Sequence, residues 1–268
     1  MNENRHGTGR PLALDLNREG APGDAWGNLG LWAPGDDYGR ANRRLALRVG
    51  ERAGLAPGQR VLDLGMGTGQ QLTLWQRHFE VASIVGLDPD ADHCAWARRW
   101  QRPEDRIVQA GAEALRDHAE AHRFDAAVAV DAAYHFRDRC ALLADLAQML
   151  TPEGRAAWSD LVLADGARRP GPLLAAALAT AGVPAANLTS PERYAALLHD
   201  AGWRDVALEV LDVAVLDGFP TWWFAYRRRQ PVRTRMWLRA EITARVLHAN
   251  SRRRRFGYVI VSARPPLP

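Results

Sequence analysis

Asp63 and Asp88 are two carboxylates that each follow a short apolar run and precede a turn. Residues 61–64 and 81–87 have the apolar, β-branched composition of buried strands. Open α/β sheets bind ligands at the carboxyl ends of their parallel strands, which meet at one edge. A carboxylate at that edge can accept hydrogen bonds from an ammonium group or from paired hydroxyls. The two acids therefore predict a ligand site, with simple capping of turns or helices as the alternative.

Three glycines, Gly65, Gly67 and Gly69, follow Asp63 at alternate positions, and residues 70–80 are expected to form a helix. A glycine turn between a strand and a helix lets the backbone approach a ligand, because glycine has no Cβ and tolerates positive φ. A dinucleotide fingerprint would have the spacing G-x-G-x-x-G. The spacing here is G-x-G-x-G, so NAD is the least favoured ligand. A glycine turn in a protein that binds no nucleotide is the alternative.

His135 is the residue best suited to move a proton. It lies in the stretch Asp131-Ala132-Ala133-Tyr134-His135-Phe136, which follows a predicted strand over residues 124–131. A neutral imidazole can act as a general base under physiological conditions. Asp160 ends the next predicted strand, and a carboxylate beside the imidazole would fix its tautomer. The alternatives are a histidine that only satisfies a turn and an aspartate that bonds only to nearby backbone.

Strands and helices alternate along most of the chain, which predicts an α/β protein with a parallel sheet and right-handed crossovers. Seven strands are expected, at residues 61–64, 81–88, 106–109, 124–131, 155–160, 205–215 and 256–263. The alternation is interrupted at 162–189, where Pro170, Pro172 and Pro184 surround a short alanine-rich helix at 173–181. This segment is interpreted as a lid.

Composition limits the classes of function. The 268 residues carry a net charge of +4, and all basic residues are arginine. The arginine runs at 227–229 and 252–255 lack interleaved aromatics and are interpreted as solvated faces rather than a nucleic-acid site. We expect no membrane span, no secretory signal and a cytoplasmic location. His118 and His122 are four residues apart but have no third ligand nearby, so no metal site is predicted.

The stretch Asp63-Leu-Gly-Met-Gly-Thr-Gly69 resembles the first motif of class I S-adenosylmethionine (SAM)-dependent methyltransferases. The stretch at 131–136 resembles a motif of sugar and polyketide O-methyltransferases. The resemblance covers roughly residues 28–265 and implies a Rossmann-like, seven-stranded, mostly parallel sheet with an antiparallel last strand, helices on both faces and a lid after strand five. It implies a single domain over 1–268, divided into an N-terminal cap (1–45), a SAM-binding core (46–161), the lid (162–189) and the C-terminal half of the sheet (190–268).

The resemblance also implies roles for individual residues. Asp63 would face the methionine amine of SAM, and the three glycines would admit the cofactor to the backbone. Asp88 would bind the ribose, and the adjacent Pro89 would also contact the cofactor. Relatives usually place an aspartate after strand three to bind the adenine amine, but Gly111 occupies that position here. The N–H of Ala112 remains for the adenine ring, and Glu113 is a substitute for the missing acid. Asp131 would either face the methionine portion or cap the next turn.

The implied function is transfer of a methyl group from SAM to a hydroxyl of a small metabolite of the natural-product type, with S-adenosylhomocysteine (SAH) as product. His135 would be the general base, assisted by Asp160. A nitrogen or carbon acceptor is the alternative, as is a SAM-binding relative that catalyses a non-methylating reaction such as cyclisation. Trp222, Trp223, Phe224 and Tyr226 either line the acceptor pocket or pack a hinge. The sequence leaves a homodimer, the acceptor and an assisting divalent metal open.

Overall fold

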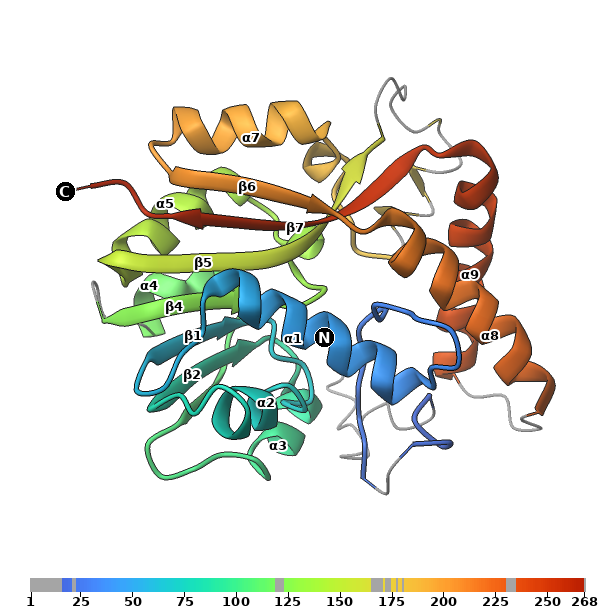
Figure 1. The fold of residues 1–268 in the computed structure, drawn as a ribbon, viewed down its shortest axis with the longest axis horizontal. Helices are drawn as coiled ribbons and strands as arrows, with labels where there is room; N and C mark the ends of the chain where they lie inside the picture. Colours follow the sequence, from blue (N-terminus) through green and yellow to red (C-terminus); the bar gives the residue numbers. More distant parts are fainter. Residues whose placement is uncertain are drawn as a thin grey trace, which may run out of the picture.

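Within the part of the chain that the computed structural model describes, seven strands form one sheet in the order β3-β2-β1-β4-β5-β7-β6 (Figure 1). β7 runs antiparallel to β5 and β6, and the other neighbouring strands are parallel. The predicted Rossmann-like sheet with its antiparallel last strand is therefore confirmed. The strands are β1 (Arg60–Leu64), β2 (Ser83–Asp88), β3 (Arg106–Gln109), β4 (Phe124–Ala129), β5 (Leu150–Leu163), β6 (Arg204–Val210) and β7 (Phe256–Arg264). The described residues are 16–20, 23–118, 123–164, 171, 175–176, 178–179, 181–229 and 235–267.

Helices cover both faces of this sheet. Val61 and Leu62 point to opposite faces, as successive residues of a strand do, and they belong to two separate buried clusters. The cluster around Val61 includes side chains of α1 (Tyr38–Ala53), α2 (Leu72–Arg77) and α3 (Ala91–Ala97). The cluster around Leu62 includes side chains of α4 (Leu115–His118), α5 (Arg139–Met149) and α7 (Pro191–Asp200). The core is thus two layers of apolar side chains separated by the sheet.

Two further helices, α8 (Gly218–Arg229) and α9 (Arg235–Arg253), lie together beyond the end of the sheet at which β7 begins (Figure 1). Trp222 of α8 stacks on Tyr38 and on Trp32, with ring centroids 4.6 and 5.4 Å apart. We call the group Trp32, Tyr38, Phe219, Trp222, Trp223 and Tyr226 the aromatic cluster. Trp223 and Tyr226 are fully buried within it. Trp222 therefore packs α8 against the segment around Trp32 and against the first turn of α1, whereas Trp223 packs α8 against Trp237 of α9.

The structure differs from the expected elements near β6. The predicted strand over 205–215 ends at Val210, and a π-helix over Val213–Asp217 follows. The carboxylate of Asp212 accepts the N–H of Tyr258 at 2.6 Å, and the chain then turns so that Leu216 is buried. The alternation of apolar residues continued past this turn, which is why the strand was predicted too long.

Other boundaries also shift. β5 continues to Leu163, so Asp160 lies inside the strand rather than at its end. The expected division between the cap and the core at residue 45 falls inside α1. Most of the predicted helix at 173–181 lies outside the described residues. No helix in the described residues has the length and apolar character needed to cross a membrane.

Candidate active site

The glycine turn after β1 has the conformation that its sequence predicts. Gly65, Gly67 and Gly69 have φ values of +71°, +58° and +73°, which disfavour residues with a Cβ. A Cβ at Gly65 would lie 2.6 Å from that of Ala132, and a Cβ at Gly69 would lie 2.7 Å from that of Ala97. A Cβ at Gly67 would meet no atom within 4 Å. The outer two glycines thus allow close packing, whereas the middle one leaves the backbone open.

The open side of this turn faces a cavity of about 480 Å³ at the carboxyl ends of β1 to β4. Its volume is typical of a small-molecule or cofactor site. The walls come from five segments that are far apart in the sequence: residues 25–28, 65–71, 87–93, 110–113 and 130–137. In the described part of the chain, no group of three or more His, Cys, Asp or Glu side chains is placed to hold a metal ion.

Asp88 lies in this cavity wall with its carboxylate firmly held. Its Oδ2 accepts the N–H of Gly67 at 2.9 Å, and its Oδ1 accepts the N–H of Asp90 at 3.0 Å. Nδ1 of His93 is 3.1 Å from the same Oδ1. Burial lowers the pKa of His93, but the hydrogen bond and charge of Asp88 outweigh this effect and raise it. The adjacent Pro89 also lines the cavity.

His93 was not identified as a site residue from the sequence. The signal that could have identified it is its place in the first turn of a helix that starts directly after the β2 acid. In that position the side chain can turn back toward the strand end. The structure shows that it pairs with Asp88 and lines the cavity.

Asp63 is fully buried and does not itself line the cavity. Nε2 of Gln71 donates to both of its oxygens, at 3.0 and 3.1 Å, and Nε1 of Trp75 donates at 2.7 Å. Burial raises the pKa of Asp63 to about 7, against the lowering effect of these two donors. Gln71 does line the cavity, so Asp63 faces a ligand through the amide of Gln71. We call residues 63–71 together with Asp88 the cofactor edge.

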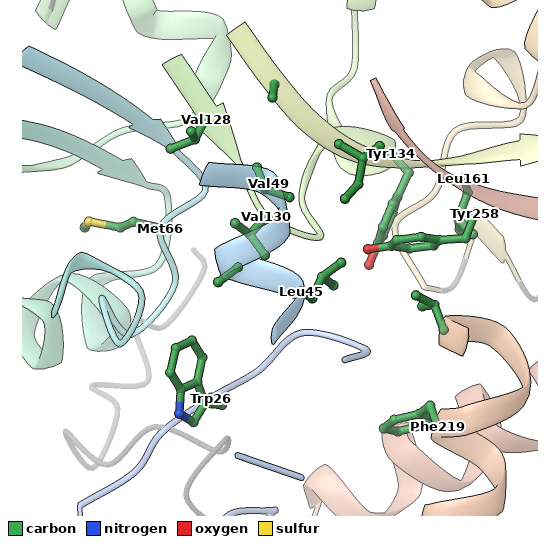
Figure 2. Packing of buried hydrophobic residues seen from close by; sticks show 14 of the residues in the cluster. Trp26, Leu45, Val49, Met66, Val128, Val130, Tyr134, Leu161, Phe219 and Tyr258 are labelled. Atoms are coloured by element: carbon green, nitrogen blue, oxygen red, sulfur yellow. The ribbon is translucent and has the colours of Figure 1, made fainter. Parts of the chain in front are cut away.

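Asp131 connects three parts of the chain above β4. Its Oδ1 accepts the hydroxyl of Tyr258 at 2.7 Å, and its Oδ2 accepts the N–H of Leu29 at 2.7 Å. Its own N–H donates to Oγ of Ser159 at 2.7 Å, with the backbone at a φ of +57°. Tyr134 and Tyr258 are among the buried residues labelled in Figure 2. Burial raises the pKa of Asp131, and the residue also lines the cavity.

The N-terminal segment forms one wall of the cavity. Oγ1 of Thr68 donates to the carbonyl of Ala25 at 2.6 Å, and the N–H of Ala25 donates to Oε1 of Gln70 at 3.2 Å. Trp26 and Asn28 follow along the same wall. Trp26 is seen below the glycine turn and Met66 in Figure 2. The residues of the predicted N-terminal cap that line the cavity are thus 25–28.

His135 lies in the cavity wall, in a short 3-10 helix (Ala133–His135), and is exposed. Its Nδ1 is 3.0 Å from the carbonyl oxygen of Gly182, which belongs to the predicted lid. Because a carbonyl only accepts, this contact places the proton on Nδ1 and leaves Nε2 as the acceptor. The bond that orients the ring therefore comes from backbone 47 residues away.

Asp160 lies in a separate buried group of polar side chains. Its Oδ2 accepts the hydroxyl of Tyr194 at 2.6 Å and lies 2.7 Å from Nη2 of Arg139. Its Oδ1 accepts the N–H of Leu161 at 2.8 Å. Burial raises the pKa of Asp160 to about 6, although the charge of Arg139 opposes this. The described hydrogen bonds of Asp160 and His135 thus go to different partners, and Asp160 does not line the cavity.

The remaining predicted residue, Ala112, lines the cavity beside Gly111 and Glu113, after the end of β3. The structure therefore brings nearly all the predicted cofactor residues to one cavity: the residues that line it are Gly65, Gly67, Asp88, Pro89, Ala112 and Asp131. Gly69 shapes the turn behind it, and Asp63 lies one side chain away.

Comparison with known proteins agrees with this geometry. A family profile described as a methyltransferase domain matches residues 37–208. Erythromycin 3''-O-methyltransferase of Saccharopolyspora erythraea is 31% identical over 226 residues, which are 79% of this chain and 74% of that protein. The 27-O-demethylrifamycin SV methyltransferase of Amycolatopsis mediterranei is 27% identical over 90% of this chain and 91% of its own.

Solved structures share the fold. Geranyl diphosphate C-methyltransferase from Streptomyces coelicolor has a TM-score of 0.74 at 16% identity, over 96% of this chain and 93% of its own. The [4+2]-cyclase SpnF has a TM-score of 0.70 at 21% identity, over 90% of this chain and 88% of its own. The family profile spans most of the chain, and the first relative is matched over most of its length. The chain therefore belongs to the family of SAM-dependent methyltransferases.

Proposed function

We propose that this methyltransferase transfers the methyl group of SAM to a hydroxyl of a small metabolite of the natural-product type, with His135 as the general base. The observation that carries the proposal is the contact between Nδ1 of His135 and the carbonyl of Gly182. It leaves Nε2 free to accept a proton at the wall of the cavity. The two relatives described above modify erythromycin and a rifamycin, and this supports a hydroxyl-bearing natural product as acceptor.

The cavity can hold SAM against the cofactor edge. SAM supplies a methyl group on a sulfonium, which makes the methyl carbon electrophilic. The open space at Gly67 admits a ligand against the backbone, and the carboxylate of Asp88 is placed to accept ribose hydroxyls. Nε2 of Gln71 donates to Asp63, so its carbonyl oxygen is left for the methionine ammonium. Pro89 and Ala112 would contact the adenine end.

The acceptor hydroxyl must lose a proton as its oxygen attacks the methyl carbon in line. His135 would take that proton on Nε2 while Nδ1–H stays hydrogen-bonded to Gly182. Asp131 and Asp160 would assist through their electrostatic interaction with His135. For Asp160 this help acts at a distance and is offset by its ion pair with Arg139. The segment at 25–28 would exclude water from the cofactor side.

A hydroxylated macrolide and polyketide panel with methyl-labelled SAM tests this function. We expect a labelled O-methyl product and equimolar SAH. His135→Ala should lower kcat by about 10²- to 10⁴-fold, the usual contribution of a general base, while SAH affinity changes less than about twofold. His199→Ala, which removes an exposed histidine on α7, is the control. Full turnover by His135→Ala would disprove the base, and label on nitrogen or carbon would disprove the hydroxyl acceptor.

A non-methylating reaction is the second candidate function, because the chain shares its fold with a [4+2]-cyclase. In that case the cofactor would stay intact while the substrate is converted. The same assay separates the two functions, because only methyl transfer yields SAH in proportion to product.

We also expect the acceptor to be a small molecule rather than a nucleic acid. Arg227 and Arg229 of the first arginine run pair with Glu241 and Glu19, and Arg254 of the second run pairs with Asp217. These pairs lower the positive charge that either run could offer to a phosphate backbone. The cytoplasmic location and the four-part division of the domain remain predictions.

A further inference from the structure

We propose that Glu113 binds the exocyclic amine of the adenine ring, in place of a side chain at position 111. The inference rests on the proposed cofactor but not on the proposed acceptor or base. It concerns the end of the cavity beyond β3, where Ala110, Gly111, Ala112 and Glu113 form the wall.

The carboxylate of Glu113 occupies the space that a side chain at position 111 would fill. A Cβ on Gly111 would lie 2.5 Å from Oε1 of Glu113 and 2.6 Å from its Cδ. The backbone gives no reason for a glycine here, because Gly111 has a φ of −74°, which any residue adopts. The Glu113 side chain therefore folds back over Gly111 and fills the space that a side chain at position 111 would need.

The Glu113 carboxylate is also without a partner. Among the described residues, none donates a hydrogen bond to it or forms an ion pair with it, although it lines the cavity. The other acids of the wall differ: Asp88 accepts from Gly67 and Asp90, and Asp131 accepts from Leu29 and Tyr258. Glu113 thus lines the cavity with a carboxylate that accepts no hydrogen bond from the described residues.

The neighbouring backbone completes a two-point contact. The N–H of Ala112 lies in the first turn of a 3-10 helix (Ala112–Ala114) and has no acceptor within that helix. One edge of adenine carries a ring nitrogen that accepts a hydrogen bond and an amine that donates one. The N–H of Ala112 would pair with the ring nitrogen, and the carboxylate of Glu113 would pair with the amine. Hypoxanthine carries a carbonyl in place of the amine, so its oxygen would face a carboxylate. Such a site should reject the deaminated base strongly.

Calorimetric binding of SAH and of S-inosylhomocysteine, its deaminated analogue, tests the inference. We expect the wild type to bind SAH more tightly than the analogue. Glu113→Ala should lose about tenfold to hundredfold in SAH affinity, as for a hydrogen bond to a charged group, and its preference for SAH over the analogue should become smaller, because only the N–H of Ala112 still distinguishes the two bases. Asp117→Ala removes the same charge from a residue outside the cavity wall, and it should bind both ligands as the wild type does.

A rescue variant guards against a purely structural effect. Gly111→Asp alone should weaken SAH binding, because its Cβ needs the space of the Glu113 carboxylate. In the Glu113→Ala background, the same substitution should restore preference for SAH. Glu113→Ala with unchanged affinity and discrimination would overturn the inference, as would a double variant that binds no better than Glu113→Ala. If the wild type binds neither ligand, the protein does not use SAM, and the proposed function itself is refuted.

Discussion

The cofactor edge and the aromatic cluster hold their shapes by different interactions. The cofactor edge consists of positive-φ glycines and carboxylates that accept backbone and side-chain N–H groups, as Asp88 does from Gly67. The aromatic cluster consists of large rings that pack on one another, with Trp222 4.7 Å from Tyr226 between centroids. The first region leaves a cavity open, whereas the second fills its space.

Because of this difference, we expect mutations in the cofactor edge to change mainly ligand affinity and mutations in the aromatic cluster to change mainly stability. Removing the ring of Trp223, which does not line the cavity, should leave a void that costs free energy of unfolding but does not alter the cavity wall. Adding a methyl group at Gly67, the open position of the cofactor edge, should occupy ligand space and cost affinity more than stability. The predictions that follow test this separation, beginning with the largest expected effect.

Trp223→Ala should lower the free energy of unfolding by about 3–5 kcal/mol, the usual result of removing a buried tryptophan. Trp223 is fully buried, and its Nε1 donates to Glu241 at 2.8 Å. Urea unfolding measures the loss, and Trp223→Phe should cost less because it keeps most of the ring volume. SAH affinity measured on the folded variant should match the wild type. A parallel fall in affinity would show that the two regions are coupled.

Asp63→Asn should change how stability depends on pH. The pKa of Asp63 is about 7 in the folded protein and about 3.9 for an unperturbed aspartate. The folded state therefore keeps a proton that the unfolded state has lost, so this residue's contribution to stability is present at low pH and is lost as pH rises through 7. We expect this group to lower the free energy of unfolding of the wild type by about 2 kcal/mol between about pH 5 and 7. Chemical denaturation should show a flatter profile for Asp63→Asn, and an identical profile would contradict the raised pKa.

Gly67→Ala should lower SAH affinity by about tenfold or more, because a methyl group would enter the cavity. Gly58→Ala is the matched control, since both glycines have positive φ, +58° and +82°, and neither Cβ would meet an atom within 4 Å. Both variants should therefore lose a similar amount of stability, about 1 kcal/mol. Calorimetry should show the affinity loss for Gly67→Ala alone. If the Gly67→Ala and Gly58→Ala variants bind SAH equally well, the ligand does not bind against Gly67.

Arg229→Ala should give the smallest effect. Arg229 pairs with Glu19 near the aromatic cluster, but both side chains are substantially exposed, and pairs of this kind add little to stability. We expect no measurable change in the thermal midpoint or in SAH affinity. A clear destabilisation would show that charge, as well as ring packing, holds this region.

The cofactor edge could be predicted from sequence because its signals are local. Asp63, Gly65, Gly67 and Gly69 lie within seven residues, and Asp88 ends the next strand, so parallel pairing alone brings them together. The parallel sheet followed from the alternation of apolar strands with helices. The coarse fold thus needed no knowledge of distant contacts.

The acceptor side could not be predicted in the same way, because its contacts join residues far apart in the chain. The carbonyl of Gly182 reaches His135, and the N–H of Leu29 reaches Asp131 across 102 residues. Asp160 was expected beside His135, but whether a carboxylate turns toward an imidazole or toward Arg139 depends on how α5 packs. A backbone carbonyl leaves no sequence signal at all, since every residue has one.

The wall at residues 25–29 has a consequence for the rate of turnover. Thr68 and Asp131 bind this stretch through its backbone, at Ala25 and at Leu29. If this stretch moves away to let SAH leave, both hydrogen bonds must break. Product release would then contribute to the rate of turnover together with methyl transfer.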